Sequence, residues 1–271
     1  MAKGVGRSSN RTPIKHMILD KMVGKISGVL SLDSPNVPCR ANPFLVVDLC
    51  GGDGLVTLEH DASPQILHKH CMWLRQRGKR ADLIVFEERA ITFDVLTENT
   101  AGMIGRGDWF TLHNADSRSF VMPGLRENQA AFVHCDPNCV DQIPLTRPFL
   151  DSWNKYTTYL VTLGCNVGGV KKLPLSKRET WFEYVSSLVR ILPRNHDAVL
   201  FWLVNDSSQW AYLLSLPKCW SREFSSDIVK NACSWWPDGV GCVSWTSERA
   251  EFTRNINRLF LTREEFANAN Q

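Results

Sequence analysis

Residues 44–54 read Phe-Leu-Val-Val-Asp-Leu-Cys-Gly-Gly-Asp-Gly, and this stretch decides the fold. Its first four side chains are apolar, which is typical of a parallel strand buried on both faces of a sheet. The glycines that follow, Gly51, Gly52 and Gly54, let the backbone turn tightly and approach a ligand, because they carry no Cβ. The Gly-x-Gly-x-x-Gly spacing of a dinucleotide site is absent. Two interpretations remain: a loop for another nucleotide ligand, or a plain turn between a strand and a helix.

The alternation of strand and helix continues along the chain. Further buried strands are predicted at 83–86, 109–112, 130–134 and 198–204, and a closing antiparallel pair at 240–245 and 258–262. Helices are predicted at 13–30, 55–77, 88–98, 147–163, 177–192 and 207–216. This order favours an α/β fold with a mostly parallel sheet and helices on both faces.

Acidic residues end four consecutive predicted strands. They are Asp48, Glu87, Asp116 and Asp136. Parallel strands bring their carboxyl ends to one edge of the sheet, and ligands of such folds bind at this edge. We therefore expect carboxylates to line a ligand site, although each acid taken alone is also typical of a turn or of a helix N-terminus.

Composition places the chain among globular proteins. It has 271 residues, of which 44% are hydrophobic and 22% charged, and its net charge is +3. We find no signal peptide, no apolar run near 18 residues and no Cys-x-x-Cys pair, so we expect a cytoplasmic protein with free thiols and no membrane span. His68-Lys69-His70-Cys71 fits no standard zinc spacing, and we predict a polar helix surface there and no metal.

The length suits a single domain with an N-terminal extension. Residues 1–43 are predicted to form a basic extension with one helix, which could contact phosphates or RNA or be a solvated tail. Residues 44–271 are predicted to form the α/β domain, with a possible substrate-loop insertion around 140–175.

The loop at 48–54 resembles the first motif of class I S-adenosylmethionine-dependent methyltransferases, which reads Asp/Glu-x-Gly/Ala/Cys-x-Gly-x-Gly. The resemblance implies a Rossmann-like, seven-stranded fold and S-adenosylmethionine as the cofactor. It assigns Cys50 and Gly51 to the cofactor loop, and places Gly52 and Gly54 along the methionine part of the cofactor. Asp48 would contact the cofactor's amino group, directly or through water, as a carboxylate beside a cation.

The same resemblance gives roles to the next two acids. Glu87 would accept both ribose hydroxyls of the cofactor, since a carboxylate offers two acceptor oxygens to a diol. Glu88 competes for this role, but it points the opposite way if the strand continues. Asp116 would accept the adenine amino group. No metal is implied.

His134-Cys135-Asp136-Pro137-Asn138-Cys139 closes the fourth predicted strand. Amino-methylating relatives have Asp/Asn/Ser-Pro-Pro-aromatic here, where the first residue and a backbone carbonyl orient the target amine and the aromatic ring stacks on a flipped base. Asp136, Pro137 and Asn138 are therefore the catalytic candidates. Asn138 stands where the second proline is expected, and Cys139 where the aromatic residue is expected. Trp153 or Tyr156 could supply the missing ring, whereas a nucleophilic role for Cys139 is disfavoured against that of a bystander thiol.

The sequence thus predicts a methyltransferase that modifies a base amine in DNA or RNA, with nucleic acid as its partner. The Asn138 and Cys139 departures favour a second hypothesis, a non-catalytic binding or regulatory protein on a degenerate methyltransferase fold. Methylation of a protein or a small molecule is a third. More loosely, the chain resembles the three-Cys-motif partner proteins and small N6-adenine methyltransferases of nucleic acids.

Overall fold

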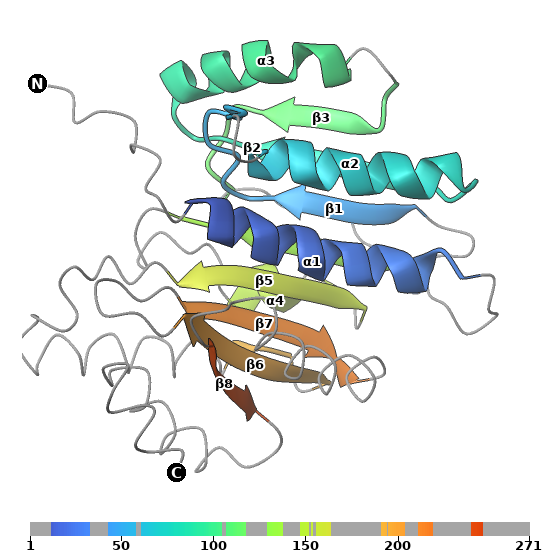
Figure 1. The fold of residues 1–271 in the computed structure, drawn as a ribbon, viewed down its shortest axis with the longest axis vertical. Helices are drawn as coiled ribbons and strands as arrows, with labels where there is room; N and C mark the ends of the chain where they lie inside the picture. Colours follow the sequence, from blue (N-terminus) through green and yellow to red (C-terminus); the bar gives the residue numbers. More distant parts are fainter. Residues whose placement is uncertain are drawn as a thin grey trace, which may run out of the picture. The chain divides into compact units, whose positions relative to one another are not determined.

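The structure is a computed structural model, and its secondary structure follows the predicted alternation in the first half of the chain (Figure 1). It describes residues 12–32, 43–57, 61–104, 107–117, 129–137, 147–151, 153, 156–163, 191–193, 195–203, 211–218 and 240–245. The chain divides into two compact units, Met1–His134 and Cys135–Gln271. In the described part, no helix is long and apolar enough to cross a membrane.

A parallel sheet forms the core of the first unit. Its strands are β1 (Phe44–Asp48), β2 (Ala81–Phe86), β3 (Phe110–His113) and β4 (Ala131–Cys135), in the order β3-β2-β1-β4. All three neighbouring pairs are parallel. Strand β1 is central, and all five of its residues are buried, as its apolar sequence predicts.

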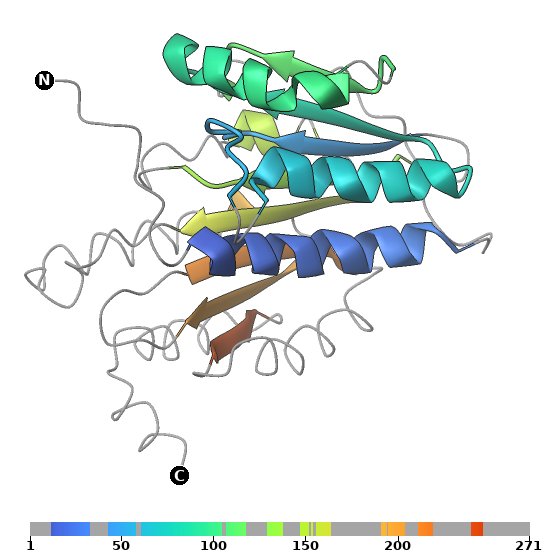
Figure 2. The same ribbon diagram turned by 45° about the horizontal axis from the view of Figure 1, so that its top comes forward.

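Three helices complete the described part of the first unit. They are α1 (Thr12–Leu30), α2 (Ser63–Gln76) and α3 (Ala90–Ile104). Helix α2 packs against β1 and β2, α1 packs against α2, and α3 packs against β3. Figures 1 and 2 show α1 and α2 side by side along the sheet. Helix α2 begins eight residues after the predicted start at 55, where Pro64 occupies the first turn, a position that suits proline.

The described strands of the second unit pair antiparallel. They are β5 (Thr157–Leu163), β6 (His196–Leu203), β7 (Ala211–Pro217) and β8 (Val240–Trp245), in the order β5-β7-β6-β8, and a short helix, α4 (Arg147–Asp151), precedes β5. The predicted antiparallel strand at 240–245 is confirmed. Its predicted partner at 258–262 and most of the predicted helix at 177–192 lie outside the described residues.

Two helix predictions are wrong. The segment 147–163 is helical only in α4 and then forms β5, whose Thr-Thr-Tyr start is rich in residues that favour strands. The segment 207–216 was predicted as a helix, but 211–217 form β7. A short apolar run fits a helix or a strand equally well, and here pairing with β5 and β6 decides. The α/β prediction holds, with four strands in each unit among the described residues where seven in total were expected.

Candidate cofactor site

The loop after β1 contains three glycines with two different structural reasons to be glycine. A Cβ on Gly51 would lie 2.4 Å from Val85 Cγ1, and a Cβ on Gly54 would lie 2.7 Å from Leu96 Cδ1, so both positions are closely packed. Gly52 and Gly54 have φ of +63° and +61°, which favours glycine. A Cβ on Gly52 would meet nothing within 4 Å, so Gly52 is the glycine of this loop that lies beside open space.

Hydrogen bonds hold this loop in place from three elements. The Gly51 N–H donates to the Phe86 carbonyl at the end of β2 (2.7 Å). The Gln65 amide of α2 donates to the Gly54 carbonyl (2.6 Å), and the Asn99 amide of α3 donates to the Asp53 carbonyl (2.9 Å). A loop held in this way does not have to be ordered when a ligand binds, which favours affinity.

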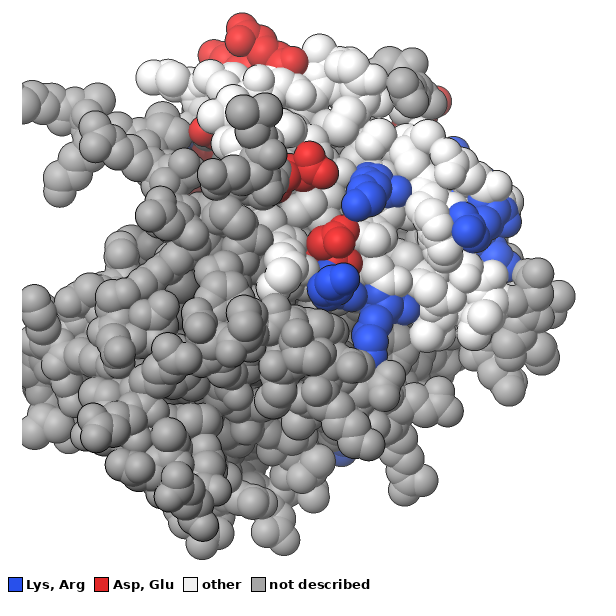
Figure 3. Space-filling view, viewed as in Figure 1, with Lys and Arg blue, Asp and Glu red and all other residues white. Residues whose placement is uncertain are grey.

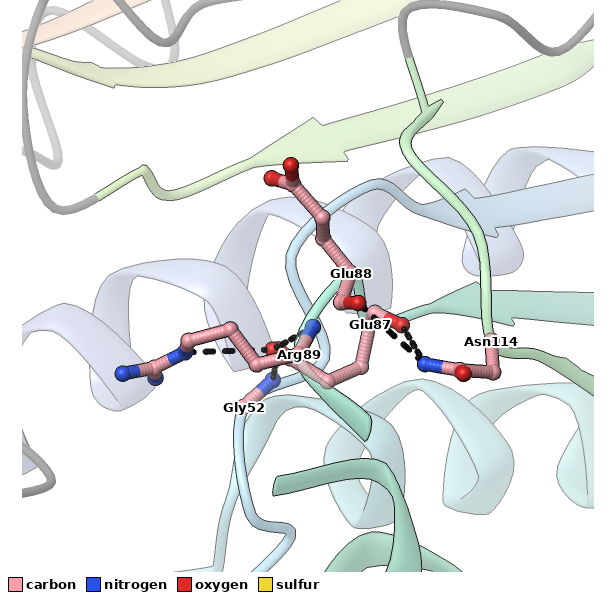
Figure 4. A network of polar contacts seen from close by, with 5 residues as sticks. All are labelled: Gly52, Glu87, Glu88, Arg89 and Asn114. Atoms are coloured by element: carbon pink, nitrogen blue, oxygen red, sulfur yellow. Dashed lines mark hydrogen bonds and ion pairs between the residues drawn. The ribbon is translucent and has the colours of Figure 1, made fainter. Parts of the chain in front are cut away.

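Glu87 joins the end of β2 to the glycine loop (Figure 4). Its Oε2 accepts a hydrogen bond from the Gly52 N–H (3.1 Å), and its Oε1 accepts one from the Arg89 N–H (3.0 Å) and lies 3.5 Å from Arg89 Nε. The residue is only 7% exposed. Each carboxylate oxygen can accept more than one hydrogen bond, so both retain capacity for hydroxyl donors of a ligand.

Asn114 fixes the backbone around Glu87. Its side-chain amide donates to the carbonyls of Glu87 (2.9 Å) and Glu88 (3.3 Å), which ties the end of β3 to the end of β2. The Glu88 side chain is exposed and points away from Gly52 in Figure 4. Of the two adjacent acids, Glu87 is therefore the one that faces the glycine loop.

Asp48 is fully buried and forms an ion pair with a histidine. Its Oδ1 lies 3.0 Å from Nδ1 of His134, on the neighbouring strand β4, and accepts a longer bond from the Cys50 N–H (3.3 Å). Burial raises the pKa of Asp48, but the charge and hydrogen bond of His134, together with smaller contributions from Ser63 and the Cys50 N–H, outweigh burial and lower it.

This arrangement bears on the role predicted for Asp48. The carboxylate is directed at His134 within the protein, and Oδ2 accepts no hydrogen bond of standard geometry from the described residues. The Asp48 side chain has no exposed surface, and its contact with the loop is the hydrogen bond from the Cys50 N–H. Asp48 is therefore placed to hold the loop in shape. The sequence alone does not indicate this role of His134, because its partner Asp48 lies 86 residues away.

The other predicted site residues are placed as follows. Cys50 is half-buried in the loop with a free thiol, and Asp116 is half-buried just after β3. Asp136 is half-buried and Pro137 is buried, both in the second unit, while Asn138 and Cys139 lie outside the described residues.

Two aromatic side chains of the second unit bear on the predicted chemistry. Trp153, one of two rings proposed to stack on a base, is buried and packs against Phe149 and Tyr159, which is a core position. Tyr212 of β7 is buried near Asp136: burial raises the pKa of Tyr212 well above its usual value, and the charge of Asp136 raises it further. The proximity of Tyr212 to Asp136 could not be predicted from the sequence, because the pattern at 207–216 predicts a helix and not a strand.

The predicted polar surface at 68–71 is partly buried. The His68 ring stacks on Trp109, with centroids 4.9 Å apart, and His70 Nε2 lies 2.8 Å from Asp20 Oδ1. Cys71 is completely buried, and burial strongly raises the pKa of its thiol. In the described part of the chain, no three potential metal ligands cluster together.

Comparison with known proteins identifies a shared fold. No family model and no curated protein sequence matches the chain. Protein LPL1258 from Legionella pneumophila matches 90% of this chain and 99% of its own, with a TM-score of 0.57 and 10% identity. At that identity the likeness concerns the fold alone.

Most of the other similar structures that we compared are methyltransferases. An rRNA methylase from Streptococcus thermophilus matches 78% of this chain and 99% of its own, with a TM-score of 0.45 and 11% identity. SMU.1697c from Streptococcus mutans, in complex with SAH, matches 75% and 97%, with a TM-score of 0.43 and 11% identity. The prediction of a Rossmann-like α/β fold is confirmed by the order and parallel pairing of the strands in the first unit.

Proposed function

We propose that this protein is an S-adenosylmethionine-dependent methyltransferase that modifies a base amine in DNA or RNA. The observation that carries the proposal is the pairing of Glu87 with the Gly52 N–H, beside the open space above Gly52. A buried carboxylate at the end of β2, next to a glycine-rich loop at the end of β1, suits a ligand that has a sugar diol close to a cationic group.

The chain's own residues fit the parts of that cofactor. Glu87 accepts hydrogen bonds from the ribose hydroxyls, and the backbone at Gly52 allows the methionine part to approach closely. Asp116, half-buried just after β3, suits the adenine amino group. Asp48 acts through the loop: its pair with His134 fixes the peptide at Cys50.

When bound, the cofactor supplies a methyl group on a positively charged sulfur, which needs no acid to activate it. The work left to the protein is to position the target. Asp136 would accept a hydrogen bond from the target amine and so hold its nitrogen lone pair in position for the transfer, while Pro137 would limit the backbone beside it. Positioning of this kind supplies most of the rate in a group transfer.

A second candidate function is binding without catalysis on the same fold. The sequence Asn138-Cys139, where relatives have proline and an aromatic residue, favours it. Methylation of a protein or a small molecule is a third candidate. The three differ in outcome: cofactor binding without transfer to any substrate indicates the second, and transfer to protein or small molecules alone indicates the third.

Calorimetric titration with S-adenosylmethionine tests the cofactor site. We expect the wild type to bind and Glu87→Gln to bind at least 10-fold more weakly, because an amide replaces one of two acceptor oxygens with a donor. Glu88→Gln is the matched control, since this exposed neighbour points away from Gly52, and it should bind as the wild type does.

The titration has a clear negative outcome. If folded wild-type protein shows no heat of binding, the methyltransferase proposal is wrong. If the wild type binds, transfer of a radiolabelled methyl group to DNA, RNA and protein, beside Asp136→Ala, identifies the substrate class. Asp136→Ala should keep cofactor binding and lose transfer.

A further inference from the structure

Charge is strongly segregated among the helices of the first unit. The α1 sequence contains three lysines and one aspartate, and residues 63–80, which contain α2, carry five basic residues and no acidic one. Helix α3 contains two acidic residues and no basic one. Figure 3 shows basic side chains gathered over α1 and α2, with acidic ones between and beside them, and further acidic ones over α3. The whole chain carries only +3, so this face is far more basic than the average surface.

The one acid in α1 is already engaged. Asp20 Oδ1 lies 2.8 Å from His70 Nε2 and 3.6 Å from Lys69 Nζ, which joins α1 to α2. The Lys69 side chain remains 65% exposed despite this contact. Lys21, which follows Asp20 in α1, is exposed as well. The weak, solvent-exposed pair leaves Lys69 able to meet another anion.

An aromatic ring stands among these cations. Trp73 lies one helical turn after Lys69, and the guanidinium of Arg77 lies 3.7 Å from the centre of the Trp73 ring. Lys69, Trp73 and Arg77 are spaced by four residues and therefore share one face of α2. Arg77 is exposed, and Trp73 is half-buried.

Arg75 shows what a structural arginine looks like on the same helix. It donates to the Ala81 carbonyl (2.9 Å), lies 3.5 Å from Asp82 Oδ1 and stacks over Trp109. These contacts tie α2 to β2 and leave Arg75 committed to the fold. Arg77 makes a 3.4 Å contact with the Trp73 carbonyl in its own turn of helix, so its charge faces outward.

We propose that the face of α1 and α2 formed by Lys21, Lys69, Trp73 and Arg77 binds the phosphate backbone of a nucleic acid. The three cations neutralise phosphates, and the Trp73 ring with its stacked guanidinium offers a flat surface to an unpaired base. An anionic membrane is the other polyanion to consider. Membrane-bound helices insert large apolar side chains into the bilayer. Among the described residues of α1 and α2, no large apolar side chain is exposed.

The proposal is independent of methyl transfer, because it needs neither the glycine loop nor a cofactor. Its test is fluorescence anisotropy of a labelled 20-nucleotide single-stranded RNA, and of the same sequence as single-stranded and duplex DNA, over a range of salt. We expect Lys21→Gln/Lys69→Gln/Arg77→Gln to bind at least 10-fold more weakly. The slope of log affinity against log salt should fall by about 2, from three phosphate contacts at about 0.7 each on single strands.

Single variants provide matched controls. Lys69→Gln and Lys218→Gln each remove one charge, and only Lys69→Gln should weaken binding, since Lys218, just after β7, is not one of the residues that form the proposed face. Asp20→Asn removes the only acid on α1 while keeping a side chain that can bond to His70, and it should tighten binding. Trp73→Leu should weaken single-strand binding more than duplex binding.

Three outcomes would overturn the proposal. The first is a wild type that binds none of the probes at low salt. The second is a folded triple variant that binds with wild-type affinity and salt slope. The third is stronger binding to phosphatidylserine vesicles than to any nucleic acid, lost in the same triple variant. Because no cofactor enters this assay, failure of the methyltransferase proposal would show separately, in the calorimetric titration.

Discussion

Replacing His134 by leucine removes the imidazole that faces a carboxylate with no exposed surface. His134 is 4% exposed and its Nδ1 lies 3.0 Å from Asp48 Oδ1. Breaking a buried ion pair from one side leaves an uncompensated charge, which costs about 3–5 kcal/mol. That is a large part of the 5–15 kcal/mol that stabilises an ordinary domain. We therefore expect His134→Leu to destabilise β1 and β4 of the first unit severely at pH 7.

The loss should depend on pH with a definite sign. In the wild type the pKa of Asp48 lies below 3.8, so its stabilising contribution is complete above that value and disappears as pH falls through the lowered pKa. Without His134, burial raises the pKa of Asp48 instead, and the folded variant takes up a proton as pH falls. The difference in unfolding free energy between wild type and variant should therefore shrink toward acid.

Hydrogen exchange of the β1 and β4 amides, read by mass spectrometry between pH 4 and 7, measures this difference locally. His196→Leu, read on the β6 and β7 amides, is the control: His196 is also buried, but its Nδ1 faces the hydroxyl of Ser215 (2.9 Å), so the change should cost about 1–2 kcal/mol with no acid dependence linked to a carboxylate. A loss below about 1 kcal/mol for His134→Leu, or one equally large at pH 4 and pH 7, would refute the ion-pair argument.

Three further predictions concern the glycine loop and its surroundings. Gly51→Ala places a Cβ 2.4 Å from Val85 Cγ1, and thermal unfolding should show a loss of stability of about 1–3 kcal/mol. Gly52→Ala introduces only about 1 kcal/mol of backbone strain, yet calorimetry should show a loss of cofactor affinity. Asn114→Ala removes two hydrogen bonds to the Glu87 and Glu88 carbonyls, and it should weaken cofactor binding several-fold with a stability loss of about 1–2 kcal/mol. Iodoacetamide should modify half-buried Cys50 much faster than buried Cys71 and Cys135, and S-adenosylmethionine should protect Cys50. Equal rates of modification of the three cysteines, measured by peptide mapping, would contradict the placement of the loop.

The sequence predicts the first unit well because its signals are local. Four apolar runs, each followed by a polar turn, become β1, β2, β3 and β4 within two residues of their predicted bounds. Both acids that end β1 and β2 bond to the glycine loop: Asp48 accepts a hydrogen bond from the Cys50 N–H, and Glu87 accepts one from the Gly52 N–H. The cofactor roles themselves stay predictions.

The second unit was predicted less well because long-range pairing decides its strands. Tyr212, Leu213 and Leu214 are all buried in β7 between β5 and β6, and nothing in 207–216 alone distinguishes such a strand from a buried helix. His134 was missed for a related reason. A histidine at the end of a strand gains its meaning from a partner on another strand, and no local pattern marks that partner.

The unequal packing of the three loop glycines has a consequence for how the sequence can vary. The space beside Gly51 is taken by Val85, so a larger residue at 51 fits only if residue 85 becomes smaller. Among related sequences, side-chain volumes at 51 and 85 should therefore covary inversely. Gly52 and Gly54 both have positive φ, so the backbone itself favours glycine at these two positions whatever stands at their neighbours.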